Sequence, residues 1–511
     1  MSADGPFFVT TPIYYVNDTP HLGHAYPTVA ADVLARFMRL DGRRVKFLTG
    51  TDEHGQKVER SAQALGLTPL QFADHVSAAF REMDRLLDIS YDDYIRTTEE
   101  RHTRGVQALW HELERRGEIY LGRFAGWYCV RDEAFYDESE LVDGKAPTGA
   151  EVEWLEEENY FFRLSAWQDR LLAYYDANPD ALAPRSRRNE VISFVRAGLN
   201  DLSISRTSFS WGIPVPGNPE HVVYVWLDAL ANYITALGYP DTENAEFSNF
   251  WPSVLHVVGK DILRFHAVYW PAFLMAAGLE PPRRIFAHGW WTIEGEKMSK
   301  SLGNGIPPDL LVERYGVDSA RYFLLRELPF GSDGDFSHRA VVGRLNSDLA
   351  NDFGNLAQRV LVMINRNCAG CVPDYGELRA GDTALLNAAQ TVLGTVRGHI
   401  AEQAFHLALE AIWRVVGEAN RYVDEQAPWA LSRSDPARMG TVLYTLAETL
   451  RHLAILVQPF VPGAGRKLLD QLAVPQAARD FAALAEAPLA PGTRLPKPEA
   501  IFPRFVEEAA G

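Results

Sequence analysis

An apolar strand, a helix and a second apolar strand follow one another at the start of the chain, and this order restricts the possible fold more than any other feature. Residues 7–10 and 45–48 are short β-prone runs. Between them, five apolar residues recur at helical spacing before Asp41 and Gly42 end the pattern: Val29, Val33, Leu34, Phe37 and Leu40. Two strands joined through a helix lie parallel in one sheet, so the sequence predicts an α/β fold.

A second region of the same kind lies far along the chain. Residues 255–258 are typical of a buried strand, Gly259 precedes a helical stretch, and residues 285–288 indicate a further strand. The stretch between the two regions differs, because residues 118–213 are rich in aromatic and acidic side chains and close at a Pro/Gly-rich segment. We therefore predict one parallel sheet that is split by an inserted domain.

The last third of the chain has a different pattern again. From about residue 340 onward, long helical patterns with few strands predict a helical bundle. The proline-rich residues 488–503 are expected to form an extended tail packed on the surface. The 511 residues exceed the ~250–300 at which single hydrophobic cores stop growing, so several domains are expected.

Composition limits the classes of protein to consider. No apolar run approaches the ~18 residues that span a bilayer, and residues 1–6 lack the features of a signal peptide. Three cysteines are too few for a disulfide framework, which fits a reducing cytoplasm. The formal net charge of −17 has the wrong sign for binding nucleic acid through a general basic surface. A nucleic-acid partner must therefore be held by local patches.

Two histidines mark the start of the first helix. In the run Asp18-Thr19-Pro20-His21-Leu22-Gly23-His24, Asp18 or Thr19 can cap a helix and Pro20 suits its first position. His21 and His24 then share one face of a helix N-terminus, where backbone N–H groups and the helix dipole favour a phosphate. Gly23 leaves room for a nucleotide against the backbone. The alternative is a capped helix with two incidental histidines, or half of a metal site.

A cluster of lysines and hydroxyl residues follows the last predicted strand. It is Lys297-Met298-Ser299-Lys300-Ser301, with glycines at positions 303 and 305. Two lysines on a glycine-flanked turn suit a loop that closes over a triphosphate and neutralises the departing pyrophosphate. Taken alone, the cluster equally fits a solvated basic turn. Neither a P-loop motif nor a dinucleotide fingerprint is present.

Together, HLGH at residues 21–24 and KMSKS at residues 297–301 resemble the two signature motifs of the class I aminoacyl-tRNA synthetases. Further segments narrow the resemblance to the methionyl-tRNA synthetases and extend it over essentially the whole chain: residues 11–17, 50–55, 224–229 and 259–266. The resemblance implies a Rossmann-like parallel sheet split by a connective insertion and followed by a C-terminal α-helical anticodon-binding bundle. It also implies a ligase that activates L-methionine with ATP and Mg²⁺ and transfers it to the 3′-terminal adenosine of tRNA(Met).

The implied domains follow the composition changes along the chain. Residues 1–117 and 214–285 are expected to be the two halves of the catalytic domain, and residues 118–213 the connective insertion. Residues 286–345 are expected to carry the lysine turn and contact the tRNA stem, and residues 346–511 to form the anticodon-binding bundle with its tail.

Carried onto this sequence, the family motifs imply two sets of residues around the reaction. The ATP-binding residues are His21, Gly23, His24, Lys297, Ser299 and Lys300, of which the two histidines and two lysines are expected to be catalytic. The methionine-binding residues are Ile13, Tyr15, Asp52, Trp226, Ala229, Leu230, Tyr233, Ile262 and His266. Aromatic walls suit a polarizable thioether, and a carboxylate suits the substrate ammonium. Without the resemblance, Trp226 and Tyr233 would fit a core and Asp52 a loop cap.

A polar stripe on the first helix of the bundle matches the family's anticodon-reading positions. Asn351, Asn355 and Arg359 are spaced by four, and the buried side is marked by Leu345, Leu349, Phe353, Leu356 and Val360. A solvated helix face has the same spacing. The resemblance also assigns Trp429 to stacking on an anticodon base. Stacking and edge contacts to splayed bases need few cations, which reconciles RNA binding with the acidic net charge.

Relatives often hold zinc with cysteine pairs in the insertion. Here Cys129 remains, Asp132 takes the second place, and residues 144–149 contain no cysteine. One thiolate cannot complete a closed four-ligand site, so we expect no metal and a knuckle held by packing. Cys368 and Cys371 form a lone C-x-x-C that we interpret as incidental.

Other functions are weighed on the same residues. An insertion near 100 residues is too small for an editing domain plus the connective module, which disfavours the leucine, isoleucine and valine enzymes. The cysteines are too few for the zinc-bound thiol site of a cysteine enzyme. The alternatives are a class I synthetase for another amino acid, a silent tRNA-binding protein and a small-molecule adenylyltransferase. The chain lacks an appended dimerising module, so a cytoplasmic monomer is expected.

Overall fold

A seven-stranded parallel sheet forms the centre of the computed structural model, which describes residues 5–17, 19–131, 134–136, 138–293, 296–297 and 306–507. Its strand order is β2-β3-β1-β13-β14-β8, with β4 paired to β3. The strands are β1 (Phe7–Thr10), β2 (Tyr14–Tyr15), β3 (Val45–Asp52), β4 (Asp93–Arg96), β8 (Leu182–Ala183), β13 (Val254–Gly259) and β14 (Arg284–His288). β1 pairs with β13, so the two predicted halves form one sheet, as expected.

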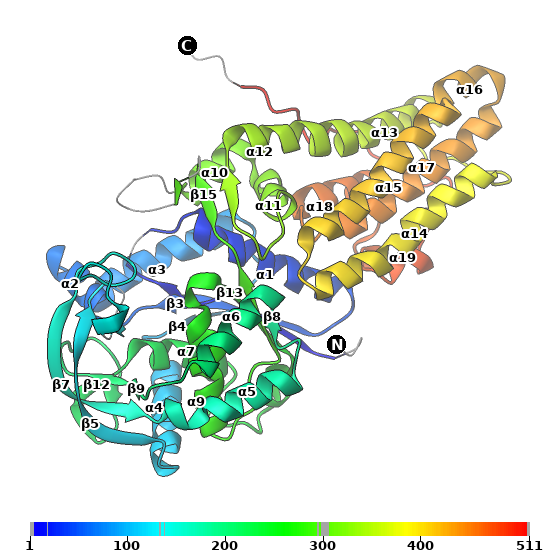
Figure 1. Ribbon diagram of the computed structural model, residues 1–511. Coiled ribbons are helices and arrows are strands. Elements are labelled where there is room, and N and C mark those ends of the chain that lie inside the picture. The colour runs from blue at the N-terminus through cyan, green and yellow to red at the C-terminus, as the bar shows by residue number, and fades with distance from the viewer. Residues whose placement is uncertain are drawn as a thin grey trace.

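Helices cover both faces of this sheet, and the alternation along β1 explains why. Phe7 and Val9 belong to one core cluster with α1 (Leu22–Leu40) and α3 (Pro69–Leu86). Phe8 belongs to a second cluster with α4 (Glu100–Arg115), α7 (Val225–Thr235) and α9 (Trp270–Ala276). Successive side chains of a strand point to opposite faces, so both faces of the strand must be covered by apolar side chains. In Figure 1, α1 crosses above the sheet while α4, α7 and α9 lie below it.

The inserted region forms two antiparallel sheets. One has the order β6-β5-β7-β9 and consists of β5 (Ile119–Cys129), β6 (Ala134–Tyr136), β7 (Glu153–Phe162) and β9 (Leu202–Ser203). The other has the order β10-β12-β11 and consists of β10 (Ser205–Arg206), β11 (Pro214–Val215) and β12 (Asn218–Val223). Between α5 (Gln168–Ala177) and α6 (Arg185–Arg196), strand β8 pairs with β14. Residues 118–213 therefore contribute one strand, β8, to the parallel sheet.

A small sheet and two helices connect the parallel sheet to the bundle. β15 (Trp291–Ile293) pairs with β16 (Glu296–Lys297) and with β17 (Gly334–Phe336). Between these strands lie α10 (Pro308–Tyr315) and α11 (Val317–Arg326). Two short helices lie elsewhere beside the parallel sheet: α2 (Gln56–Ala64) contacts α3, and α8 (Ala245–Phe250) lies just before β13.

The C-terminal part is the predicted helical bundle. Its helices are α12 (His338–Arg344), α13 (Asn355–Asn367), α14 (Ala380–Ala401), α15 (Phe405–Gln426), α16 (Pro428–Ser434), α17 (Pro436–Val457), α18 (Pro462–Gln471) and α19 (Ala483–Glu486). A π-helical stretch, Leu345–Gly354, joins α12 to α13, and the five apolar residues predicted to be buried along this stretch and the start of α13 are buried. The tail packs on the bundle as predicted, with Leu489 and Leu495 buried. No helix in the described part of the chain is both long and apolar enough to cross a membrane.

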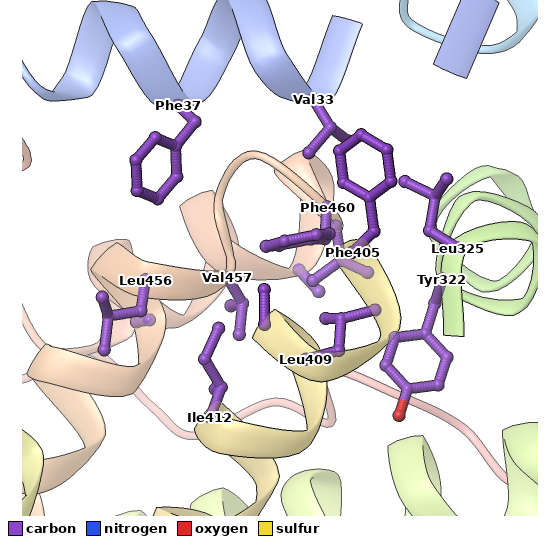
Figure 2. Close-up of a cluster of buried hydrophobic side chains, with 14 of the residues drawn as sticks. Val33, Phe37, Tyr322, Leu325, Phe405, Leu409, Ile412, Leu456, Val457 and Phe460 are labelled. Carbon is purple, nitrogen blue, oxygen red and sulfur yellow. The ribbon is translucent and has the colours of Figure 1, made fainter. Parts of the chain in front are cut away.

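The helix that follows β1 is also packed against the bundle. Figure 2 shows Val33 and Phe37 of α1 facing Phe460, with side chains from α11, α15 and α17 completing the cluster. The rings of Phe37 and Phe481 lie 4.8 Å apart, and the Phe481 N–H donates to the Leu40 carbonyl at 3.0 Å. One helix thus connects the crevice of the parallel sheet to the distant bundle.

A buried ion pair lies at the same junction. Arg321 on α11 and Asp32 on α1 are both fully buried, and Arg321 Nη2 lies 2.6 Å from Asp32 Oδ2. The guanidinium also donates to the carbonyls of Leu87, Pro459 and Phe460. Burial would raise the pKa of Asp32, but Arg321 and Arg36 lower it below its ordinary value. Arg321 therefore joins α1, the end of α3 and the turn after α17 through one charged group.

Candidate functional site

The carboxyl edge of the parallel sheet is where the predicted site residues gather. The strand order reverses between β1 and β13, and open α/β sheets bind their ligands in the crevice at such a point. Strands β1, β3, β13 and β14 end at this edge, and each is followed by predicted site residues. Thr10 Oγ1 and His256 Nδ1 lie 2.8 Å apart and join β1 to β13.

The two predicted histidines cap α1 themselves. The prediction that Asp18 or Thr19 caps this helix was wrong, because His21 is the N-cap. Its Nδ1 accepts from the Gly23 N–H at 3.0 Å, and His24 Nδ1 accepts from the His21 N–H at 3.1 Å. The two imidazoles form the reciprocal capping pair that hydroxyl and carboxyl side chains usually provide.

This capping fixes the tautomer of both rings. Because Nδ1 of each ring accepts a hydrogen bond, the proton of each neutral imidazole is on Nε2. The centroids of the His21 and His24 rings lie 4.0 Å apart, so two Nε2–H donors sit side by side at the positive end of the helix dipole. Such a pair suits neighbouring oxygens of a phosphate.

Three side chains hold His24 in its orientation. The rings of Tyr14 and Phe80 meet its imidazole edge-on, at centroid distances of 5.1 Å each. The Tyr14 hydroxyl lies 2.6 Å from Thr28 Oγ1, which donates to the His24 carbonyl at 2.8 Å. Burial raises the pKa of Tyr14, so its hydroxyl stays protonated at neutral pH.

Both ends of the lysine turn lie beside α1. On the incoming side, Lys297 of β16 pairs with Thr292 of β15, and the neighbouring Trp291 ring lies 5.6 Å from that of Tyr26 on α1. On the outgoing side, the Leu22 N–H donates to the Ile306 carbonyl at 3.0 Å. The predicted Ser299 and Lys300 lie outside the described residues, as does the side chain of Lys297. The backbone on each side nevertheless leads the turn to the helix that carries His21 and His24.

The predicted methionine pocket is assembled from three segments. Ile13 and Tyr15 follow β1, Ile262 and His266 follow β13, and α7 supplies four residues: Trp226, Ala229, Leu230 and Tyr233. The Tyr233 hydroxyl lies 2.7 Å from His266 Nε2. The ring of Trp226 stacks on that of Phe265 with centroids 3.7 Å apart. The arrangement provides aromatic walls around a small number of polar atoms.

His266 is neutral and fixed in one tautomer. Its Nδ1 donates to the Ile262 carbonyl at 2.9 Å, so its Nε2 accepts from the Tyr233 hydroxyl. Burial lowers the pKa of His266 to about 4, and burial also lowers that of His256 well below its ordinary value. Two uncharged imidazoles therefore line this region at neutral pH.

The low pKa of His266 predicts a loss of stability in mild acid. Between an unfolded pKa of about 6.5 and a folded pKa of about 4, only the unfolded chain binds the proton, so stability falls as pH falls. From pH ~7 to ~5 this group alone is expected to reduce the free energy of unfolding by about 2 kcal/mol. Urea denaturation of the wild-type chain and of His266→Gln at both pH values measures it. The variant should lose less stability than the wild type, and equal losses would contradict the assignment.

The acidic residues after β3 have different surroundings. Asp52 is 8 % exposed, and Tyr15 pairs with it through the backbone. The next residue, Glu53, is fully buried and accepts from Thr51, Arg96 and Thr98. Glu53 is thus a structural carboxylate, while Asp52 remains at the sheet edge beside the predicted pocket.

One polar residue of the pocket helix was missed by sequence reasoning. Asp228 of α7 is fully buried, and its carboxylate accepts from His54 Nδ1 at 2.7 Å and from His102 Nε2 at 2.8 Å. Burial would raise the pKa of Asp228, but the two histidines lower it. The signals in the sequence are its place within the motif segment 224–229 and its charge on a largely apolar helix.

The predicted anticodon residues fall into two groups. Arg359 and Trp429 are together: the guanidinium carbon lies 5.6 Å from the Trp429 ring centroid, and Nη2 lies 2.9 Å from Asp424 Oδ1. With Gln358, Val362 and Met363 they line an open groove of about 350 Å³, and Trp429 is 52 % exposed. Asn351 and Asn355 are exposed on the same helical rod but do not line this groove. Asn351 lies in the π-helical stretch, which replaces the ordinary helix predicted there.

The predicted knuckle contains a small apolar cluster. Cys129 is fully buried and packs with Ala146 and Ala150, and Tyr136 and Val152 lie against them. Asp132 lies outside the described residues. Within the residues that the structure does describe, no group of three His, Cys, Asp or Glu side chains could hold a metal ion. All three cysteines are free thiols, and burial raises the pKa of Cys368.

Comparisons with known proteins identify similar sequences and similar structures. Residues 7–153 and 139–361 match a family model described as tRNA synthetases class I (M), and residues 372–510 match the anticodon binding domain of methionyl tRNA ligase. The chain is 57 % identical over 508 residues to the methionine–tRNA ligase of Mesorhizobium japonicum and 58 % identical over 506 residues to that of Brucella suis. Each match covers 98 % of both chains. Mycobacterium tuberculosis methionyl-tRNA synthetase in complex with methionyl-adenylate superposes with a TM-score of 0.95 at 54 % identity, covering 98 % of this chain and all of that one.

Proposed function

The chain belongs to the methionyl-tRNA synthetases of class I, which are methionine–tRNA ligases, and on that premise we propose how its residues divide the reaction. In the first step the methionine carboxylate attacks the α-phosphorus of ATP in line. A carboxylate is already a nucleophile at neutral pH, so this step needs positioning and charge stabilisation instead of a general base.

His21 and His24 stabilise the crowded phosphorus centre. The observation that carries this assignment is the pair of capped imidazoles, whose Nε2–H donors lie together at the N-terminus of α1. Backbone N–H groups and the helix dipole act on the same oxygens. Gly23 keeps the backbone accessible to the nucleotide between the two rings.

Lys297, Ser299 and Lys300 act on the other side of the nucleotide. β16 ends at Lys297, and the carbonyl of Ile306 accepts from the N–H of the first residue of α1. The lysines neutralise the departing pyrophosphate. Mg²⁺ would enter as part of the ATP substrate and help to neutralise the charge of the departing pyrophosphate.

Methionine is held at both of its ends. Asp52 binds the α-ammonium, and the thioether lies among the side chains of the pocket assembled from α7 and the segments after β1 and β13. The neutral His266, fixed by Tyr233 and the Ile262 carbonyl, keeps that wall uncharged. A polarizable, unbranched side chain is the substrate that such walls favour.

The bundle reads the anticodon of tRNA(Met). Trp429 offers an exposed ring for stacking on a splayed base, and Arg359, held by Asp424, lies at its edge. Stacking of a base on an aromatic ring contributes about 1–3 kcal/mol. Asn351 and Asn355 provide amide groups for base edges further along the rod. A ribose hydroxyl of the terminal adenosine then attacks the adenylate.

Three further assignments remain proposals. We propose that the five-part domain division given above holds, with residues 286–345 contacting the tRNA stem. We propose that the knuckle is stabilised by the packing of Cys129, Ala146 and Ala150 without zinc. We also propose a cytoplasmic monomer; its free cysteines fit a reducing compartment.

ATP–pyrophosphate exchange, measured with each amino acid in turn, tests the substrate assignment. Exchange with methionine alone is expected. Exchange with another amino acid would select a different class I synthetase, and no exchange would leave a silent tRNA-binding protein. Changing the anticodon of tRNA(Met) should then reduce the charging of the tRNA. The rate of ATP–pyrophosphate exchange should stay constant, because the groove at Trp429 lies in the bundle and not at the sheet edge.

A further inference from the structure

The carboxylate of Asp228 connects two parts of the methionine site that are otherwise separate. His54 Nδ1 donates to its Oδ2 at 2.7 Å, and His102 Nε2 donates to its Oδ1 at 2.8 Å. All three side chains are buried, with exposed fractions of 7 % for His54 and 0 % for the other two. An ionised buried carboxylate that accepts from two rings in this way holds both donors firmly.

The segment of His54 carries the group proposed to bind the ammonium. His54 follows Asp52 by two residues, at the point where β3 ends and the chain turns into α2. The turn is also held from the other side, because the Trp211 indole N–H donates to the Glu53 carbonyl at 2.6 Å and the Gly55 N–H donates to the Trp211 carbonyl at 3.0 Å. The bond from His54 ties it to the pocket helix.

The helix of Asp228 carries the group of side chains proposed to hold the thioether. Asp228 lies on α7 between Trp226 and Ala229, and Tyr233 follows on the same helix. The His54–Asp228 hydrogen bond therefore joins the segment of Asp52 directly to the helix that carries four of the proposed pocket residues.

We propose that His54 and Asp228 are positioning residues for methionine: their hydrogen bond fixes Asp52 relative to the pocket of α7, so that the two ends of the free amino acid are bound together. This inference rests on the proposed role of Asp52. Neither residue touches the nucleotide site at His21 and His24, so the bond acts on the amino acid and not on ATP.

His102 is a matched control, since it donates to the same carboxylate from a different element. Its ring comes from α4, and its Nδ1 lies 2.8 Å from Thr235 Oγ1, also on α7. It therefore holds α7 against α4 without reaching the Asp52 segment. Loss of either histidine leaves one oxygen of Asp228 without its donor, so both variants should lose similar stability.

The experiment compares His54→Asn, His54→Gln and His102→Ala by methionine-dependent ATP–pyrophosphate exchange and thermal melting. An asparagine amide nitrogen occupies the place of imidazole Nδ1, and a glutamine amide nitrogen that of Nε2. His54→Gln is expected to raise KM for methionine by about tenfold with KM for ATP unchanged. His54→Asn should restore the wild-type KM, and His102→Ala should lower the melting temperature without changing KM for methionine.

Two results would overturn the inference. One is a wild-type KM for methionine in His54→Gln. The other is an equal rise in His54→Gln and His102→Ala, which would make the network merely structural. Asp52→Asn separates this failure from that of the proposed function. If it too leaves KM for methionine unchanged, the ammonium assignment itself is wrong; if it raises KM while His54→Gln does not, only the positioning role fails.

Discussion

Replacing His24 by alanine is expected to slow methionine-dependent ATP–pyrophosphate exchange by roughly 10²–10³-fold, with KM for methionine nearly unchanged. The His24 ring has two roles. Its Nδ1 accepts from the His21 N–H and closes the start of α1, which leaves the proton of the neutral ring on Nε2. The ring lies beside that of His21, with centroids 4.0 Å apart. A preorganised donor of this kind acts on charge that develops in the transition state, so its loss lowers kcat and not substrate binding.

Two amide variants separate these roles. His24→Asn places its side-chain oxygen near the position of Nδ1 and keeps the cap, but it has no donor at the outer position. His24→Gln also keeps the cap, because a glutamine at this helical position accepts from the N-cap N–H, as Gln71 does from Thr68 in α3, and its amide N–H group reaches the outer position. We expect the exchange rate of His24→Asn to be as low as that of the alanine variant, with a near wild-type melting temperature. His24→Gln should keep more of the rate at a similar melting temperature, whereas the alanine variant should lose both. A fully active His24→Asn would mean that His24 serves only the helix end.

Replacing Arg321 by methionine is expected to reduce the free energy of unfolding by about 3–5 kcal/mol. The side chain is fully buried, and its guanidinium satisfies Asp32 and three backbone carbonyls from separate elements. Methionine fills much of the volume but leaves these acceptors with fewer donors, and Asp32 keeps only Arg36 and Ser90. Urea denaturation followed by tryptophan fluorescence measures the change.

Arg85→Met is the control for this variant. Arg85 pairs with Glu82 at 2.6 Å on the surface of α3, where the two side chains are 69 % and 51 % exposed. Exposed pairs contribute about 0–1 kcal/mol, so this variant should unfold almost like the wild type. Similar urea midpoints for the two variants would show that the buried pair does not hold α1 to the bundle.

Strands and helices that depend on neighbouring residues could be predicted from the sequence, whereas contacts between residues far apart in the chain could not. The runs around β1, β3, β13 and β14 were predicted because apolar spacing within a few residues determines a strand, and α1 because its apolar residues recur at helical spacing. The pocket residues of α7 were predicted through the family motif. Asp228 was missed, because its partners His102 and His54 lie 126 and 174 residues away in the chain.

The same reasoning explains the other differences. The role of Arg321 could not be predicted from the sequence, since its partner Asp32 is 289 residues away. The cap of α1 was assigned to Asp18 or Thr19 because these types usually cap helices, whereas the structure uses His21. The π-helical stretch Leu345–Gly354 has no signature in the apolar spacing, which fitted an ordinary helix. Local propensity does not predict features that depend on contacts made in the folded chain.

The packing of α1 limits how this chain can be divided. The helix has 19 residues, about 28 Å at a rise of ~1.5 Å per residue. One end bears the imidazoles that we propose to bind phosphate, and the flank of the other end packs on the bundle. A fragment truncated near residue 345 would leave Val33, Phe37 and their neighbours facing water as one contiguous apolar patch, a surface prone to aggregation. The part proposed to bind the 3′ end of the tRNA and the part proposed to bind its anticodon therefore share one hydrophobic core through α1. Neither part is expected to fold without the other.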